Sequence, residues 1–323
     1  MLKDILELRK GFKLVCGAGN EDADEVEKLV TIYSLAGCNF FDVCAKPEIV
    51  DAAKRGLERA GIKDDRYLCV SVGISGDPHI TKAKIDCEKC ISCGACQKIC
   101  PHEAINFSNK YEINQERCLG CSQCKTNCPT QAISMEAKII DYAEVLPELI
   151  EKGIDCIEFH VISEDDNDVF EKWGLINHLY SGMLCISLDR SELGDRKLKQ
   201  RVEKMISSRA PYTTIIQADG VAMSGNNDEY GTTLQAVATA QLFQNAKMPV
   251  YLMMSGGTNT KSTELAKLCG VRPHCLAVGS YARKIVKDYL KRPDILENSI
   301  ALQEAVDIAK VLIDTSLENM KDD

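Results

Sequence analysis

The sequence predicts an α/β fold, a (β/α)8 barrel of the TIM type with a small α+β module inserted after its third strand. Two observations predict it. Eight short apolar segments alternate with amphipathic segments along the 323 residues, which is the order of a parallel barrel. Between the third and fourth of these segments lies a stretch with two dense groups of cysteines. A chain of this length can hold one large barrel with an insertion, or two domains.

Each apolar segment has the features of a buried parallel strand, because it is short, apolar throughout and closed by Gly, Asp or Ser. The segments between them have helical spacing; Val26, Leu29 and Tyr33 share one face of the first. A doubly wound sheet is the alternative, but only a fragment, GAGN, of the G-x-G-x-x-G pattern follows the first segment. The eight segments are KLVCGAG (13–19), NFFDVCA (39–45), RYLCVSVG (66–73), DCIEFHV (155–161), MLCISLD (183–189), TTIIQADG (213–220), PVYLMMSGG (249–257) and HCLAVGSYA (274–282).

The insertion divides the predicted barrel into two parts. Residues 1–81 form the first part, 82–136 the insertion, and 137–323 the remainder with a C-terminal helix. Loops that follow barrel strands open on the face where active sites are built, so the insertion is expected beside the barrel mouth. An apolar stripe in residues 299–317 either seals the barrel or meets a second subunit, which leaves a homo-oligomer open. The stripe is Leu302, Val306, Ala309, Ile313 and Leu317.

The two cysteine groups are copies of one another. CEKCISCGACQKICP (87–101) and RCLGCSQCKTNCP (117–129) align at a constant offset of 28 residues, as from Cys90 to Cys118. Both contain C-x2-C-x2-C-x3-C-P, the spacing of bacterial ferredoxins with two [4Fe-4S] clusters. Zinc sites usually use paired C-x2-4-C knuckles separated by a longer loop. The repeat therefore predicts a ferredoxin-like module with two [4Fe-4S] clusters.

In such a repeat three closely spaced thiolates hold one cluster, and the fourth, before a proline, reaches the other cluster. One cluster is assigned to Cys90, Cys93, Cys96 and Cys128, and the other to Cys118, Cys121, Cys124 and Cys100. Cys87 has no mate in the second copy, where Gln115 stands. It is either a solvent-side thiol or a substitute ligand.

The remaining cysteines favour a structural role. The chain has 17 cysteines, an odd count, and its charged N-terminus is not a secretory signal, which argues against a disulfide framework. Outside the repeat they lie mostly in apolar runs, where cysteine behaves as a small buried hydrophobe. These are Cys16, Cys38, Cys44, Cys69, Cys156, Cys185, Cys269 and Cys275.

Composition restricts the partners. A net charge of −9 argues against nucleic acid or an anionic membrane surface. No apolar run approaches the roughly 20 residues that span a bilayer. We therefore expect a cytoplasmic protein whose partner is a redox protein or a small-molecule electron donor or acceptor.

Two glycine-rich turns are candidates for an anion site. SGGTN (255–259) and VGSYAR (278–283) follow the seventh and eighth strands, where many barrels bind phosphate through backbone N–H groups. The candidate ligand is flavin mononucleotide (FMN) or another phosphate-bearing molecule, held by Gly256, Gly257, Gly279 and Ser280, with Arg283 as counter-ion. Glycine is expected at 256 and 279 because a side chain there would occupy the anion's space. Alternatively, the backbone alone requires these glycines.

No catalytic residue is identified with certainty. His160 and Asp219 end predicted strands and are weak acid–base candidates, but structural hydrogen bonds explain such residues equally well. The loop 218–233 either covers the barrel mouth or is a surface turn. No lysine ends a strand in the way that many flavin barrels place one for the flavin ring.

Several motifs together resemble the light-dependent period protein (LdpA) family. They are KLVCGAG, LAGCNFFDVCAKPEIVDAA, GDPHITKAKID, QADGVAMSGNNDEYGTT, MSGGTNTKSTELAKLCGV and AVGSYARK, which span almost all of residues 13–285. The family contains iron–sulfur proteins of cyanobacteria that modulate the circadian clock in response to redox state. The first cysteine set is more regular here than is typical of the family, which favours two complete clusters. The resemblance implies a redox protein, although no clock partner is indicated by the sequence.

Three functions stay open. The first is electron transfer or redox sensing by the clusters without a substrate. The second is an oxidoreductase whose barrel binds a flavin or a phosphorylated small molecule and receives electrons from the clusters. The third is a barrel that serves only as a scaffold.

Overall fold

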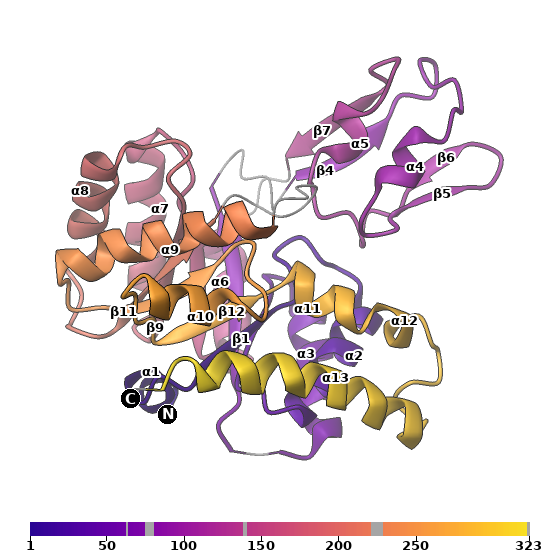
Figure 1. Ribbon diagram of the computed structural model, residues 1–323. Coiled ribbons are helices and arrows are strands. Elements are labelled where there is room, and N and C mark those ends of the chain that lie inside the picture. The colour runs from indigo at the N-terminus through magenta and orange to yellow at the C-terminus, as the bar shows by residue number, and fades with distance from the viewer. Residues whose placement is uncertain (63, 75–80, 138–140, 221–228, 322–323) are drawn as a thin grey trace.

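Eight parallel strands close into a barrel in the spatial order β1-β12-β11-β10-β9-β8-β3-β2 (Figure 1). This computed structural model describes residues 1–62, 64–74, 81–137, 141–220 and 229–321. The predicted (β/α)8 fold is confirmed, and the doubly wound alternative is wrong. The first strand begins and ends earlier than predicted. The strands are β1 (Gly11–Val15), β2 (Phe40–Cys44), β3 (Tyr67–Gly73), β8 (Cys156–His160), β9 (Met183–Leu188), β10 (Thr214–Asp219), β11 (Tyr251–Ser255) and β12 (Cys275–Val278).

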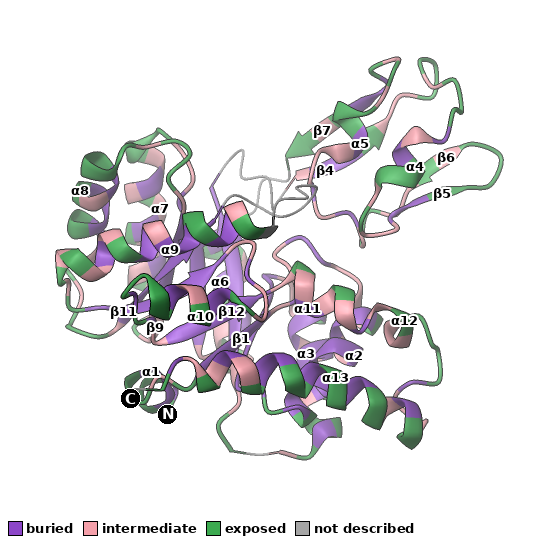
Figure 2. Ribbon diagram, viewed as in Figure 1, coloured by how far each residue is buried: buried purple, intermediate pink, exposed green. Residues whose placement is uncertain are grey.

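Helices surround the barrel with their buried sides toward it and their exposed sides outward (Figure 2). Several begin at a side-chain cap; Asp22, for example, accepts a hydrogen bond from the Glu25 N–H at 3.1 Å. The helices are α1 (Leu2–Glu7), α2 (Ala23–Leu35), α3 (Pro47–Ala60), α6 (Tyr142–Glu151), α7 (Asp166–Leu179), α8 (Asp195–Ile206), α9 (Glu229–Ala246), α10 (Ser262–Leu268), α11 (Ser280–Ile285), α12 (Lys287–Leu290) and α13 (Ser299–Glu318).

The apolar stripe of α13 lies against the protein's own core. Val306, Ala309 and Ile313 are buried, while Leu302 and Leu317 pack against the same core in partly buried positions. The helix contacts α2, α10, α11 and β1. The stripe therefore covers the barrel, as the more common use of such a stripe predicts.

The interior of the barrel is apolar at its N-terminal end. Four cysteines, Cys69, Cys156, Cys185 and Cys275, pack there among large side chains such as Tyr251. Leu2, Ile5 and Leu6 of α1 belong to the same cluster and close this end of the barrel. The prediction of cysteines as small buried hydrophobes is confirmed at seven of the eight positions. It is wrong at Cys269, which is exposed because it caps the surface helix α10.

The insertion contains two small antiparallel sheets and two short helices. They are β4 (Thr81–Ile85) with β7 (Ile133–Ala137), β5 (Ile105–Phe107) with β6 (Tyr111–Ile113), α4 (Ala95–Ile99) and α5 (Gln123–Thr126). The backbone repeats the duplication in the sequence. Left-handed φ angles occur at mates 28 residues apart, and two matching hydrogen bonds, Asp86 N–H to Ala132 O and Asn114 N–H to Ala104 O, both measure 2.7 Å. The left-handed mates are Ser92 with Gly120, Gly94 with Ser122, and Glu103 with Gln131.

The insertion leaves the barrel after β3 and returns before β8, so it lies over the barrel end away from α1 and both chain termini (Figure 1). Its paired outer strands extend from Thr81 to Ala137, and the boundaries at 82 and 136 stay a prediction. None of the helices in the described ranges is long and apolar enough to cross a lipid bilayer.

Removal of iron should unfold the insertion before the barrel. Cysteines make up three of the seven buried residues in the core of the insertion, so little apolar contact remains without a bound cluster. After anaerobic chelation, limited proteolysis followed by mass spectrometry should find the first cleavages within 81–137. Cleavage at equal rates in barrel and insertion would show that the two unfold as one unit.

Candidate functional site

Two hollows in the insertion are each lined by four of the eight predicted ligand cysteines. The outer hollow is lined by Cys90, Cys93, Cys96 and Cys128, and the inner hollow by Cys100, Cys118, Cys121 and Cys124. This is the grouping that the repeat predicts. Cys87 lines neither hollow in the described structure, and it is exposed.

The surroundings of both hollows fit an iron–sulfur cluster. Four thiols with an otherwise mostly apolar lining are the donor set of a [4Fe-4S] cluster. Backbone N–H groups point at three of the sulfurs: Ala104 to Cys100 at 3.4 Å, Ala132 to Cys128 at 3.2 Å, and Ala83 to Cys118 at 3.4 Å. Such donors stabilise thiolate charge, and hydrogen bonds to sulfur are one control of cluster potential.

A cavity of about 1050 Å³ lies between the barrel mouth and the insertion. Its lining includes His102, Leu119 and Gln123, which also line the inner hollow. The outer hollow shares no lining residue with the cavity within the described part of the chain. At the outer hollow, Cys93 is exposed and Ile91 is 65% exposed. The two hollows are therefore inequivalent: one borders the cavity and the other borders solvent.

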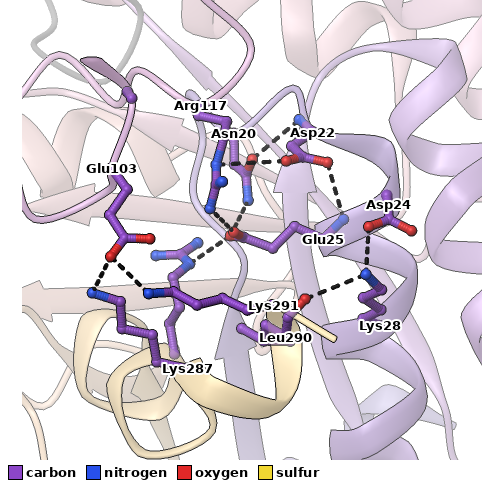
Figure 3. Close-up of polar contacts among 12 residues, drawn as sticks. Asn20, Asp22, Asp24, Glu25, Lys28, Glu103, Arg117, Lys287, Leu290 and Lys291 are labelled. Carbon is purple, nitrogen blue, oxygen red and sulfur yellow. Dashed lines mark hydrogen bonds and ion pairs between the residues drawn. The ribbon is translucent and has the colours of Figure 1, made fainter. Parts of the chain in front are cut away.

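Charged side chains hold the insertion at the barrel mouth (Figure 3). Arg117 of the insertion contacts Glu25 at 3.0 Å, and Arg283 of α11 contacts the other oxygen of Glu25 at 2.8 Å. Burial by itself would raise the pKa of Glu25, but Arg283 and Arg117 outweigh it and lower that pKa. Glu103 of the insertion forms ion pairs with Lys287 at 2.8 Å and with Lys291 at 2.9 Å. Arg283, predicted as a counter-ion for a phosphate, is thus already paired with Glu25.

The predicted anion-binding residues all line the cavity, but the reason given for one glycine is wrong. A Cβ at Gly256, where φ is +70°, would lie 2.6 Å from the backbone of Gly220. The close approach of the loops after β10 and β11 therefore requires glycine there, and not space for an anion. A Cβ at Gly279 would lie 3.3 Å from Val15. Anion binding by Gly256, Gly257, Gly279 and Ser280 stays a prediction.

A buried polar network lies inside the barrel, between its apolar end and the cavity. Lys13 of β1 bonds to Glu158 Oε2 and, at 3.2 Å, to Gln217 Oε1. Gln217 donates to Glu158 Oε1 at 2.8 Å, and His160 Nε2 lies 2.9 Å from the same oxygen. Lys13 and Glu158 were not identified from the sequence. A charged residue in the middle of an otherwise apolar strand is the signal that could have identified them. Lys13 is such a residue in β1, and Glu158 is such a residue in β8.

The two acid–base candidates from the sequence belong to this network. Asp219 accepts a hydrogen bond from the Ser187 hydroxyl at 2.6 Å, and His160 contacts Glu158. Both residues also line the cavity. The geometry therefore brings them together, and it is compatible with a structural role as well as with a chemical one. Of the loop 218–233, residues 221–228 lie outside the described residues.

Charge and burial shift the pKa values of the carboxyl groups in the network in different directions. Burial alone would raise the pKa of Glu158, but Lys13 and His160 outweigh it and lower that pKa. Burial raises the pKa of Asp42 against the opposing charge of Lys13. Burial, and after it the negative charge of Glu158, raises the pKa of Asp219 to about 6. Lys13 itself stays charged, because Asp42 and Glu158 raise its pKa against the effect of burial.

The fold and the thiol-lined hollows define an iron–sulfur protein built on a (β/α)8 barrel. A family model described as "4Fe-4S dicluster domain" matches residues 83–135. A second model, "Light dependent period A C-terminal domain", matches residues 148–315, just over half of the chain. The chain belongs to this light dependent period A family, as its motifs predicted.

One curated relative is similar over most of its length. It is "Light dependent period A" of Synechococcus elongatus, 28% identical over 97% of this chain and 91% of the relative. Among solved structures, the truncated 3-deoxy-D-arabino-heptulosonate 7-phosphate synthase of Thermotoga maritima has a TM-score of 0.46 and 9% identity, over 93% of this chain and 84% of that one. The 3-hexulose-6-phosphate synthase of Salmonella typhimurium has a TM-score of 0.43 and 10% identity, over 92% and 98%.

Replacement of Lys13 by methionine should destabilise the barrel. It leaves Glu158 and Asp42 buried without their cation, and breaking a buried ion pair costs about 3–5 kcal/mol. Anaerobic urea denaturation followed by far-UV circular dichroism should show a loss of this size in the free energy of unfolding. The double variant Lys13→Met/Glu158→Gln should recover part of it. A loss below about 1 kcal/mol in Lys13→Met would contradict the pairing.

Proposed function

We propose that the protein transfers electrons through two [4Fe-4S] clusters, one in each hollow. The observation that carries this proposal is the separation of the eight repeat cysteines into two groups of four around two hollows. A redox-sensing role would use the same two clusters. Iron–sulfur electron transfer in the cytoplasm, with a redox protein or a small molecule as donor or acceptor, agrees with the acidic charge of −9.

The exposures of the two hollows support an order of transfer. The outer hollow has an exposed ligand, Cys93, beside the exposed Ile91, so a partner can approach it closely. The inner hollow borders the cavity through His102 and Leu119. Electrons that enter at the outer cluster would leave the inner cluster toward the barrel mouth.

Single cysteine variants test the ligand assignment. Because Cys87 lines neither hollow, Cys87→Ser should retain about eight irons per chain, whereas Cys93→Ser should lose about four. Iron analysis and electron paramagnetic resonance of anaerobically purified protein measure this, with Cys269→Ser as a control thiol outside the insertion. A loss of about four irons in Cys87→Ser would make Cys87 a ligand.

A second candidate is an oxidoreductase that uses a small molecule bound in the cavity. The specific observation in its favour is the cavity of about 1050 Å³, at the upper end of small-molecule site volumes and bordered by the inner hollow. A flavin such as FMN or another phosphate-bearing ligand would meet the turns after β11 and β12. Lys13 is bonded to Glu158 and Gln217 below the cavity, which argues against its use at a flavin ring.

Charge at Ser280 tests the phosphate-bearing ligand. Ser280 is exposed on the cavity wall, so Ser280→Asp adds negative charge without a backbone conflict, and Ser280→Ala is the matched control. With FMN as the probe, fluorescence titration should show binding at least about tenfold weaker in Ser280→Asp and nearly unchanged in Ser280→Ala. If the parent protein does not bind FMN, or all three bind it equally, FMN is not the ligand of these turns.

A further inference from the structure

The cavity has an acidic floor. We define the cavity floor as the lining side chains at the mouth ends of β2, β8, β9 and β10. Lys13 is its nearest cation, and that ammonium group is fully buried beneath the floor and bonded to Glu158. Carboxyl groups therefore outnumber cations where the barrel meets the cavity. The floor consists of Asp42, Glu158, His160, Ser187, Asp189, Gln217 and Asp219.

Glu158 has no free capacity for a ligand. One of its oxygens bonds to Lys13, and the other lies at hydrogen-bonding distance from both Gln217 and His160. Its charge is balanced from below by Lys13. It shapes the floor but is already satisfied.

Asp42 is not satisfied. Its side chain is 1% exposed, and Oδ1 accepts the Ser71 hydroxyl at 2.6 Å, with Lys13 at 3.8 Å. Its other oxygen, Oδ2, is buried without a hydrogen-bond partner among the described residues, although Asp42 lines the cavity. A buried polar atom left unpaired costs about 1–3 kcal/mol, so a donor from a ligand would relieve it.

Asp219 is a floor carboxyl group that ends β10 and is partly exposed. Its Oδ2 accepts the Ser187 hydroxyl at 2.6 Å, and the Gln217 amide lies 3.4 Å from Oδ1. The ionisable groups that face it are Glu158 and His160 from β8 and Asp189 after β9. Repulsion among these carboxyl groups would fall if a cation lay between them.

We propose that the cavity floor binds a small organic cation, whose ammonium group lies among the floor carboxyl groups and is attracted by Asp42 and Asp219. This site goes beyond the proposed electron transfer and does not depend on it. An ammonium ion has three donors and no acceptor, which matches a floor of unfilled carboxyl acceptors. An anionic group is repelled by the same floor and would lie instead toward the turns that carry Gly279 and Ser280.

The test uses three small probes and the iron-loaded protein. Ethanolamine carries the ammonium group alone, phosphoethanolamine carries ammonium and phosphate, and glycerol 3-phosphate carries phosphate alone. Anaerobic isothermal titration calorimetry at pH 7 should detect both amines. Asp42→Asn and Asp219→Asn should each weaken ethanolamine binding by about tenfold or more, because each removes a negative charge from the floor. Asp155→Asn, which changes a carboxyl group outside the cavity lining, should leave it unchanged.

The pH dependence separates a direct contact from a structural effect. Ammonium binding requires ionised carboxyl groups in the floor. The pKa values of Asp219 and Asp42 are both raised to about 6, chiefly by burial, so ethanolamine affinity should fall about tenfold or more from pH 7 to pH 5. The Ser187 hydroxyl lowers the pKa of Asp219, and Ser187→Ala should therefore move the midpoint of this fall to higher pH. Circular dichroism and iron content at each pH serve as fold controls.

Four outcomes would overturn the proposal. Absence of binding by either amine would do so, as would equal amine binding in Asp42→Asn, Asp219→Asn and the parent. If potassium chloride displaces ethanolamine at the same concentrations at which it stabilises the protein against unfolding, the floor binds an inorganic cation. Binding of glycerol 3-phosphate alone would leave only the anion site at the turns. The iron count of the cysteine variants is unaffected by any of these results, so the electron-transfer proposal stands or falls separately.

Discussion

The insertion, the loop after β1 and α11 meet at one carboxylate, Glu25. This residue is largely buried at the start of α2, and it accepts hydrogen bonds from Asn20, Arg117 and Arg283. These three come from the loop after β1, from the insertion and from α11. A carboxylate with this many charged donors is held rigidly, because losing any one of them would leave charge buried without compensation. This contact and the pairs of Glu103 with Lys287 and Lys291 hold the insertion where its inner hollow borders the cavity.

The duplication produces two nearly equal halves, and docking on the barrel makes them different. Mates 28 residues apart now face different surroundings: Lys89 is exposed, whereas Arg117 binds Glu25. Ile91 faces solvent, whereas Leu119 lines the cavity, where a Cβ added at Gly17 would lie 3.4 Å from it. Two similar clusters in unequal surroundings would differ in solvent access and nearby charge, which are two of the factors that set their potentials.

The sequence predicted those parts of the molecule that depend on local pattern. Strand order, the cysteine grouping and the buried cysteines follow from apolar runs and fixed spacing, and the structure has them with the exception of the exposed Cys269. The Lys13–Glu158 pair was missed because its partners are 145 residues apart and meet only when the barrel closes. The role of Gly256 was misjudged for the same reason, since its constraint is Gly220 on a neighbouring loop. Arg283 was given to a ligand because its partner Glu25 cannot be seen from local sequence.

The buried Lys13–Glu158 pair organises the barrel interior more than it adds to the free energy of unfolding. Apolar residues of similar volume often stabilise a core as well as a buried ion pair does, so Lys13 and Glu158 gain the barrel little net free energy. Their effect is to divide the interior. Below them lie cysteines and aromatic side chains, and above them lie His160, Ser187 and Asp219 at the cavity. With Glu158 neutralised from below, its outer oxygen orients Gln217 and His160. Asp219 is a partly exposed carboxyl group at the cavity, and Asp42 is buried near Lys13. The ion pair thus determines which carboxyl groups a molecule between the barrel and the inner hollow would meet.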